Sequence, residues 1–248
     1  MSRFHIESWA AIAPGLETRD EWQQWLRDPL PIEAALGKPD LSAIPAMQRR
    51  RFSTLGKCAM GATLQLIGDD ERIPAIFASR HGDTLLSLSL LEGIARGDPM
   101  SPTSFSLAVH NAISGLYSIA RKDTSAITAI ATMDGLVLQT LFEAIGQLQT
   151  CERLLCVIYD IPLPEFYQST RDEADEPFPY AIALLLSKSS GEKLQLEPLR
   201  DDTVTEDAEG NPLLEFDAVR LLRLLAGIEN RIEFRQARNA WQLSREPA

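Results

Sequence analysis

The sequence predicts an α/β protein whose mixed, mainly parallel sheet is flanked by helices. Apolar segments typical of strands alternate along the chain with segments of helical periodicity. Two of the strand-like runs, at 151–160 and 180–189, are apolar on both faces, as central strands are. The 248 residues are 45% hydrophobic and contain no repeat or evident linker, so we expect a single domain over 1–248.

The first third of the chain is expected to hold two strands and three helices. A strand over 4–13 is followed by a short helix over 18–28 that Thr18 caps, and then by a proline-rich loop over 29–45. The next elements are a helix over 47–67, a strand over 74–80 and a helix over 83–97 that Gly97 ends.

The middle of the chain predicts a strand that turns sharply into a helix. Residues 98–110 are rich in turn formers and are expected to be extended, and the small residues of 108–122 indicate a helix that another backbone approaches closely. SAITAIA at 125–131 is expected to be a buried strand, followed by a helix over 133–148. Many acyl-transfer enzymes hold a nucleophile at such an elbow, but residues 131–134 here include neither Cys nor Ser.

The last third is expected to return to strands. Residues 161–179 and 200–212 are long acidic loops, and 193–199 alternates as a strand with one buried face does. An amphipathic helix over 215–229 precedes a closing segment that forms a strand and turn or a hairpin.

Composition argues against several functional classes. The net charge of −11 disfavours nucleic-acid binding, and the three cysteines fit neither a disulfide framework nor a zinc site, which suggests the cytoplasm. The longest apolar run, AIALLL at 181–186, cannot span a bilayer, and no signal peptide is expected. Phosphate-loop, dinucleotide and hydrolase motifs are missing, so we expect no cofactor and no metal. The basic cluster Arg49–Arg51 is either a solvated helix face or a docking patch for an acidic partner.

An enzymatic interpretation remains open at this stage. Thr132 lies at the elbow, Cys58 lies on a predicted helix, and His81 follows a strand end in SRHGD. A small acyltransferase or thioester hydrolase could use Thr132 or Cys58 as the nucleophile with His81 as the base.

Several segments, in this order, resemble a known family. SWAAIAPG, MQRRRFSTLGKCAMGA, IFASRHGD and SPTSFSLAVHNAISGLYSIARK precede the elbow. The series resembles the N-terminal half of β-ketoacyl synthases, and in particular the short synthase-like, chain-length-factor-like proteins of aryl-polyene biosynthesis. The resemblance implies a thiolase-like single half-fold with a five-stranded sheet.

The same resemblance implies a protein without condensing activity. Active members carry a Cys at the elbow, and here that position falls on about Ala131, whose methyl group cannot form a thioester. The two catalytic histidines of the family come from a C-terminal half that has no counterpart in these 248 residues. We therefore expect a non-catalytic subunit that forms a heterodimer or heterotetramer with an active β-ketoacyl synthase and works on chains held by acyl carrier protein.

The resemblance also suggests which residues meet the partner. Family dimers pair through the elbow strand and the segment before it, and the interface closes the end of the acyl tunnel. By this analogy we expect five residues of this chain at the interface or the tunnel bottom: Phe105, Ala112, Gly115, Leu116 and Tyr117.

Overall fold

The computed structural model describes residues 2–32, 35–170, 177–199, 212–236 and 239–246. Within them one eight-stranded sheet crosses the molecule in the order β3-β2-β4-β5-β1-β6-β8-β7. Its strands are β1 (Ser2–Ile12), β2 (Ala75–Ala78), β3 (Ile127–Ile130), β4 (Arg153–Asp160), β5 (Tyr180–Ser187), β6 (Glu192–Pro198), β7 (Arg231–Gln236) and β8 (Asn239–Arg245).

The expected five-stranded, mainly parallel sheet is wrong, although the α/β class is confirmed. Only β3, β2 and β4 are parallel, and every other neighbouring pair is antiparallel. Helices separate the strands of the first half, as parallel connections require. In the second half β5 leads through a short turn into β6, with β1 lying between them in the sheet, and β7 and β8 form a hairpin.

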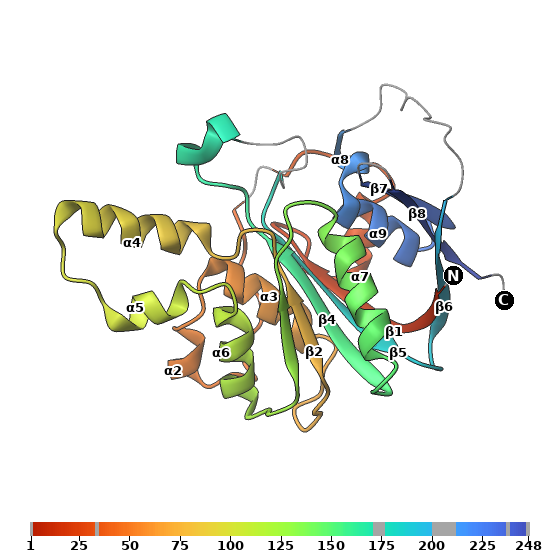
Figure 1. The fold of residues 1–248 in the computed structure, drawn as a ribbon, viewed down its shortest axis with the longest axis horizontal. Helices are drawn as coiled ribbons and strands as arrows, with labels where there is room; N and C mark the ends of the chain where they lie inside the picture. Colours follow the sequence, from red (N-terminus) through yellow and green to blue (C-terminus); the bar gives the residue numbers. More distant parts are fainter. Residues whose placement is uncertain (1, 33–34, 171–176, 200–211, 237–238, 247–248) are drawn as a thin grey trace.

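Helices cover both faces of the sheet (Figure 1). One face carries α7, α9 and α1, and the other carries α3 and α6. The helices are α1 (Arg19–Trp25), α2 (Ala46–Arg49), α3 (Thr54–Leu64), α4 (Thr84–Arg96), α5 (Pro102–Leu107), α6 (Ala112–Arg121), α7 (Leu136–Gln147), α8 (Pro212–Glu215) and α9 (Asp217–Leu225), with a 3₁₀ turn η1 (Glu165–Thr170). No helix among the described residues is long and apolar enough to cross a bilayer.

Strand β4 divides the core into two halves, because successive side chains point to opposite faces of a sheet. Leu154, Cys156 and Ile158 pack among the residues under α7 and α9. Leu155 and Val157 pack on the other face, under α3 and α6. Both β4 and β5 are buried on both faces, as their uninterrupted apolar sequence predicts.

The helix expected over 47–67 is divided into α2 and α3. Ser53 has an extended backbone and its hydroxyl accepts a hydrogen bond from the Gly56 N–H, so it caps a new helix. Eight of the eleven residues of α3 are buried. The proline-rich loop lies against this helix so closely that a Cβ on Gly61 would lie 2.5 Å from Cβ of Pro39. The chain therefore covers α3 on its outer side with its own loop.

Two expectations for the middle of the chain are also wrong. Residues 98–110, expected to be extended, contain α5, which Ser101 caps and Pro102 begins. Strand β3, expected to be buried, is the edge of the sheet, and its residues are only half-buried or exposed. The helix expected over 108–122 starts later, at Ala112, and only one of its faces is buried.

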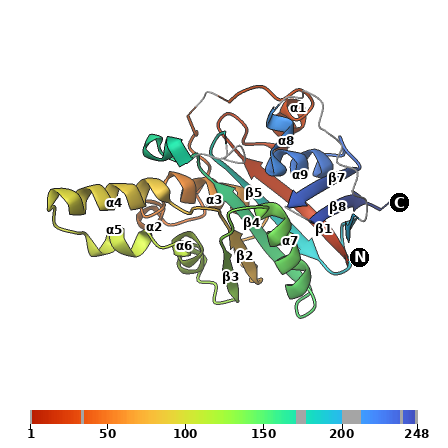
Figure 2. The ribbon, with the colours of Figure 1, turned by 45° about the horizontal axis from the view of Figure 1, so that its top comes forward.

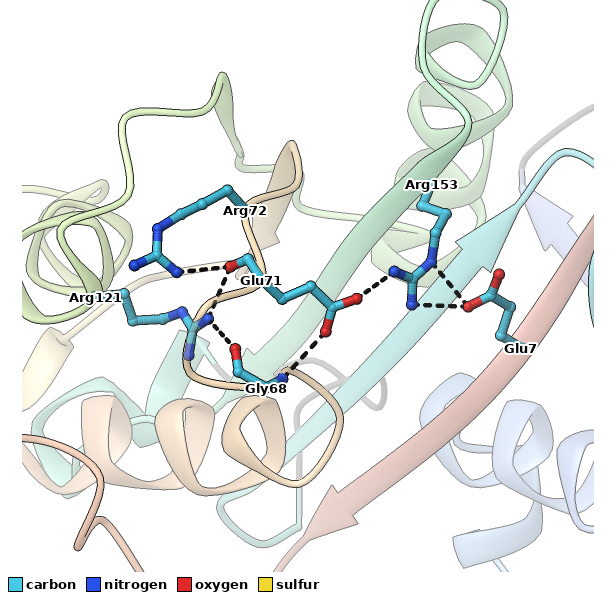
Figure 3. A network of polar contacts seen from close by, with 6 residues as sticks. All are labelled: Glu7, Gly68, Glu71, Arg72, Arg121 and Arg153. Atoms are coloured by element: carbon cyan, nitrogen blue, oxygen red, sulfur yellow. Dashed lines mark hydrogen bonds and ion pairs between the residues drawn. The ribbon is translucent and has the colours of Figure 1, made fainter.

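At the amino ends of β2 and β4, two arginines and two glutamates tie a surface loop to the sheet (Figure 3). Arg153 donates to Oε2 of Glu7, at 3.0 Å from Nε, and forms a second ion pair with Glu71. Glu7 lies at the irregularity in the pairing of β1 with β5. The guanidinium of Arg121 donates to the carbonyls of Gly68 and Glu71, at 2.7 and 2.9 Å. This network fixes the loop that leads into β2.

Candidate functional site

The elbow is present and its backbone has the expected shape. Strand β3 ends at Ile130, and α7 begins after Gly135, whose φ of 61° lies in the left-handed region that glycine tolerates. Ala131 and Met133 lie between them and are exposed, Met133 to 65% of its maximum. The exposed side chains of this turn are therefore a methyl and a thioether.

Thr132, the hydroxyl of the elbow, stabilises the turn. Its Oγ1 donates to the carbonyl of Asp134 at 2.8 Å and lies 3.4 Å from the N–H of Asp134. These contacts are those of a side chain that closes its own backbone turn. The hydroxyl proton is thereby used within the elbow.

Cys58 lies elsewhere, on α3 and completely buried. Its Sγ donates to the carbonyl of Ile12 at 3.4 Å, and burial raises the pKa of the thiol. A nucleophilic cysteine needs the opposite shift. His81 follows β2, and because Ala78 of β2 pairs in parallel with Ile130 of β3, His81 and the elbow both follow the carboxyl ends of neighbouring strands. The structure thus brings His81 and Thr132 to the same sheet edge and leaves Cys58 inside the core.

The most distinctive surface begins at the edge strand β3. One side of this strand pairs with β2, and the other side has no strand beside it among the described residues. Ile127 and Ile130 are half-buried and Ala129 is exposed. An apolar edge strand with free backbone groups is a template for pairing with another chain.

Helix α6 continues this surface. Ile113, Leu116 and Tyr117 point into the core, where the ring of Tyr117 lies 5.2 Å from that of Phe77. On the outer side Gly115 has no atom within 4 Å of the position of a Cβ, and Ile119 is 51% exposed. The predicted interface residues therefore separate into outward ones, Phe105, Ala112 and Gly115, and inward ones, Leu116 and Tyr117.

Helices α4 and α5 form an arm, residues 84–107, that projects from the body (Figures 1 and 2). No residue of either helix is buried, although α4 is rich in leucine. The arm and the segment that follows it expose six large apolar side chains to 47–59% of their maxima: Leu85, Leu91, Ile94, Met100, Phe105 and Val109. Exposed apolar side chains that gather in one region are typical of a protein–protein interface.

The arm, the outer face of α6 and the β3 edge lie on one side of the molecule, opposite the β7–β8 hairpin (Figure 2). They also follow one another in sequence, from α4 to the elbow. We call this continuous region the edge surface. It contains the outward residues predicted from the sequence.

A family model described as β-ketoacyl synthase, N-terminal domain, matches residues 22–244. The chain belongs to the β-ketoacyl synthase family. A comparison of the sequence with curated proteins finds no significant match.

Solved structures agree with this family. A chain of the complex of the ketosynthase ApeO with its chain length factor ApeC, from Xenorhabdus doucetiae, is 26% identical, with a TM-score of 0.82 over 99% of this chain and 100% of that one. The ishigamide ketosynthase/chain length factor is 14% identical, with a TM-score of 0.61 over 82% of this chain and 69% of that one. A chain of AntDE:AntF, a type II polyketide acyl-carrier protein in complex with its ketosynthase, is also 14% identical. Its TM-score is 0.63 over 98% of this chain and 99% of that one.

The sequence analysis of this synthase-family chain missed the fully buried Asp160, at the end of β4. Burial raises the pKa of its carboxyl to about 6, against the hydrogen bonds from Arg80 N–H and Ser79 that lower it. A charged residue at the end of an uninterrupted apolar run was the signal that could have identified it. The exposed apolar residues of α4 gave no such signal.

Proposed function

We propose that this chain is a non-catalytic, chain-length-factor-like subunit that forms a heterodimer with an active β-ketoacyl synthase. The observation that carries the proposal is the edge surface, which combines an unpaired apolar edge strand, an open helix face and an apolar arm. The similarity to a chain of a ketosynthase–chain length factor complex supports the same role, since the two chains match over nearly their whole lengths.

The elbow supports the absence of condensing activity. Ala131 stands at about the nucleophile position, Thr132 closes its own turn, and burial raises the pKa of Cys58. None of these groups has the environment that activates a nucleophile. The subunit therefore acts through binding, in the elongation of a polyene or other polyketide chain on acyl carrier protein.

In the heterodimer the outward residues contact the synthase. Phe105 stands on the arm, from which it can reach the partner and close the end of an acyl tunnel. Ala112 and Gly115 allow a helix of the synthase to approach α6 closely. Leu116 and Tyr117 act from inside the chain by holding α6 against the sheet.

Co-expression with the synthase encoded beside it tests the proposal. With one subunit tagged, size-exclusion chromatography and native mass spectrometry should show a 1:1 or 2:2 complex. Two separate species would overturn the proposal. Acylation of the isolated chain by an acyl-thioester analogue, lost on Thr132→Ala, would instead establish the enzymatic alternative.

A matched glycine pair tests the surface itself. A side chain at Gly115 meets open space in the isolated chain, as does one at Gly146 on α7, across the sheet. We expect Gly115→Leu to abolish the complex while leaving the isolated fold intact, because the new side chain would overpack the interface. Gly146→Leu should leave the complex unchanged. Equal binding by both variants would remove α6 from the interface.

A further inference from the structure

Two segments of the chain connect the arm to the body. Residues 79–83 lead from β2 into α4, and residues 108–111 lead from α5 into α6. Within the arm the main contacts of α4 are with α5. The direction in which the arm projects is therefore determined where these two segments meet the body.

A compact group of polar residues joins both segments to the sheet. We call Ser79, Gly82, His110 and Asp160 the hinge cluster. Asp160 Oδ1 accepts a hydrogen bond from the Ser79 hydroxyl at 2.9 Å, and Oδ2 accepts one from the Arg80 N–H at 2.7 Å. The Ser79 hydroxyl in turn accepts the Gly82 N–H at 2.8 Å. The outgoing segment is thus tied to the end of β4.

His110 ties the returning segment to the same place. Its Nε2 lies 2.9 Å from the carbonyl oxygen of Ser79. Because a carbonyl can only accept, the proton must be on Nε2. Gly82 has a φ of +64°, and a Cβ there would lie 3.3 Å from Cδ2 of His110. The glycine gives the backbone its turn and leaves room for the imidazole.

The hydrogen bonds of the hinge cluster add little to the free energy of unfolding. The carboxyl of Asp160 and the hydroxyl of Ser79 are completely inaccessible to solvent. Desolvation of a buried charge offsets what its hydrogen bonds contribute, so such groups are weak evidence for stability and better evidence for a defined geometry. The geometry defined here is that of the arm relative to the sheet.

We propose that the hinge cluster is a positioning element that holds the arm in the orientation in which its apolar side chains dock on the partner synthase. This proposal rests on the proposed function only for the identity of the partner. Ser79 is the central residue, because it bonds to β4, to the start of the arm and to its end. The edge strand and α6 supply the rest of the contact surface.

The orientation of the arm can be measured on the isolated chain. Spin labels on Arg96→Cys, at the tip of α4, and on Gln149→Cys, beyond α7, give a tip-to-body distance by pulsed electron resonance, with Cys151→Ser removing a half-buried thiol. We expect one narrow distribution in the parent chain. Ser79→Ala and His110→Leu should broaden it or move it. His110→Gln should restore it, because the Gln amide can still donate to the Ser79 carbonyl.

Binding to the co-encoded synthase gives the second readout. We expect Ser79→Ala and His110→Leu to lower its affinity at least tenfold and His110→Gln to lower it much less, with unchanged circular dichroism. An unchanged distance distribution in both variants would overturn the hinge. A broadened distribution with parental affinity would overturn its role in docking. If the parent chain binds no synthase, the proposed function fails while the distance measurement still tests the hinge.

Discussion

Helices α3 and α4 are similar in composition and opposite in surroundings. Six of the 11 residues of α3 and seven of the 13 of α4 are apolar, counting Ala, Cys, Ile, Leu and Met. Eight residues of α3 are buried, and none of α4 is. The sheet, β1 and the proline-rich loop cover α3, whereas α4 has mainly α5 beside it. The difference shows that this chain covers α3 with its own residues and leaves α4 exposed.

The largest expected effect separates a leucine of each helix. Leu55 on α3 is 1% exposed, and Leu91 on α4 is 56% exposed. Leu55→Ala should lower the free energy of unfolding by about 2–5 kcal/mol, since it leaves a cavity. Leu91→Ala should change it by less than about 0.5 kcal/mol but weaken the complex with the synthase. Urea denaturation of the isolated chain measures both, and equal losses would break the comparison.

Two glycines, one in each helix, test the same difference between α3 and α4. A Cβ on Gly61 would lie 2.5 Å from Pro39 and 2.6 Å from Ile12, so Gly61→Ala should destabilise the chain by about 1–3 kcal/mol. A Cβ on Gly93 meets nothing closer than 3.8 Å. Gly93→Ala should stabilise α4 by up to about 1 kcal/mol through helix propensity. Thermal unfolding measures both changes. A higher melting temperature for Gly61→Ala than for Gly93→Ala would contradict the close packing of the loop on α3.

A smaller, pH-dependent effect is expected at the base of the arm. Burial raises the pKa of Asp160 to about 6, from a usual value near 4. The folded state then binds a proton more tightly than the unfolded state, and the stability gained is lost as the pH rises through about 6. Relative to Asp160→Asn, the parent chain should lose up to about 1.4 kcal/mol per pH unit between about pH 4 and 6. Urea denaturation at several pH values measures the unfolding free energies of both proteins. A difference between them that does not change with pH would contradict the raised pKa of Asp160.

The smallest effect concerns the arginine network of Figure 3, which holds the loop that follows α3. Burial acts to raise the pKa of Glu71, but the hydrogen bonds from Arg153 and the Gly68 N–H outweigh it and lower the pKa. The contribution of the pair is therefore present above the unfolded pKa and is lost as the pH falls through the lower folded value. Arg153→Gln should cost about 1 kcal/mol or less at pH 7, and the cost should shrink as the pH falls through the lowered pKa of Glu71. A cost that persists in acid would point to packing by the arginine stem.

Local signals predicted the ends of α4 well. Asp83 caps it, accepting the Leu86 N–H at 3.1 Å, and Gly97 follows it at a φ of 76°. The exposure of α4 could not be predicted, because a leucine-rich sequence is the same whether the cover comes from its own chain or from another. Ser101 and Pro102, an N-cap and a first-turn proline, could have indicated the start of α5. The turn-forming residues around them instead favoured an extended segment.

Strand order was the other limit of sequence reasoning. The apolar run of β3 resembles a central strand, and only its place in the pairing makes it an edge. For the candidate site, the elbow was predicted, and Phe105 and Gly115 are exposed, but their place in an interface stays a prediction. The contacts among Ser79, His110 and Asp160 span 31 and 81 positions of the chain, so no local pattern could have indicated them.

The short distance between Ser79 and His110 has a consequence for how such a protein can change. Ser79, where the chain leaves the body, and His110, where it returns, are joined by a hydrogen bond. The segment between them is therefore topologically an insertion. Its length and composition can be altered without moving any strand. On the proposed function, grafting residues 84–107 from one such subunit onto another is expected to change which synthase it binds.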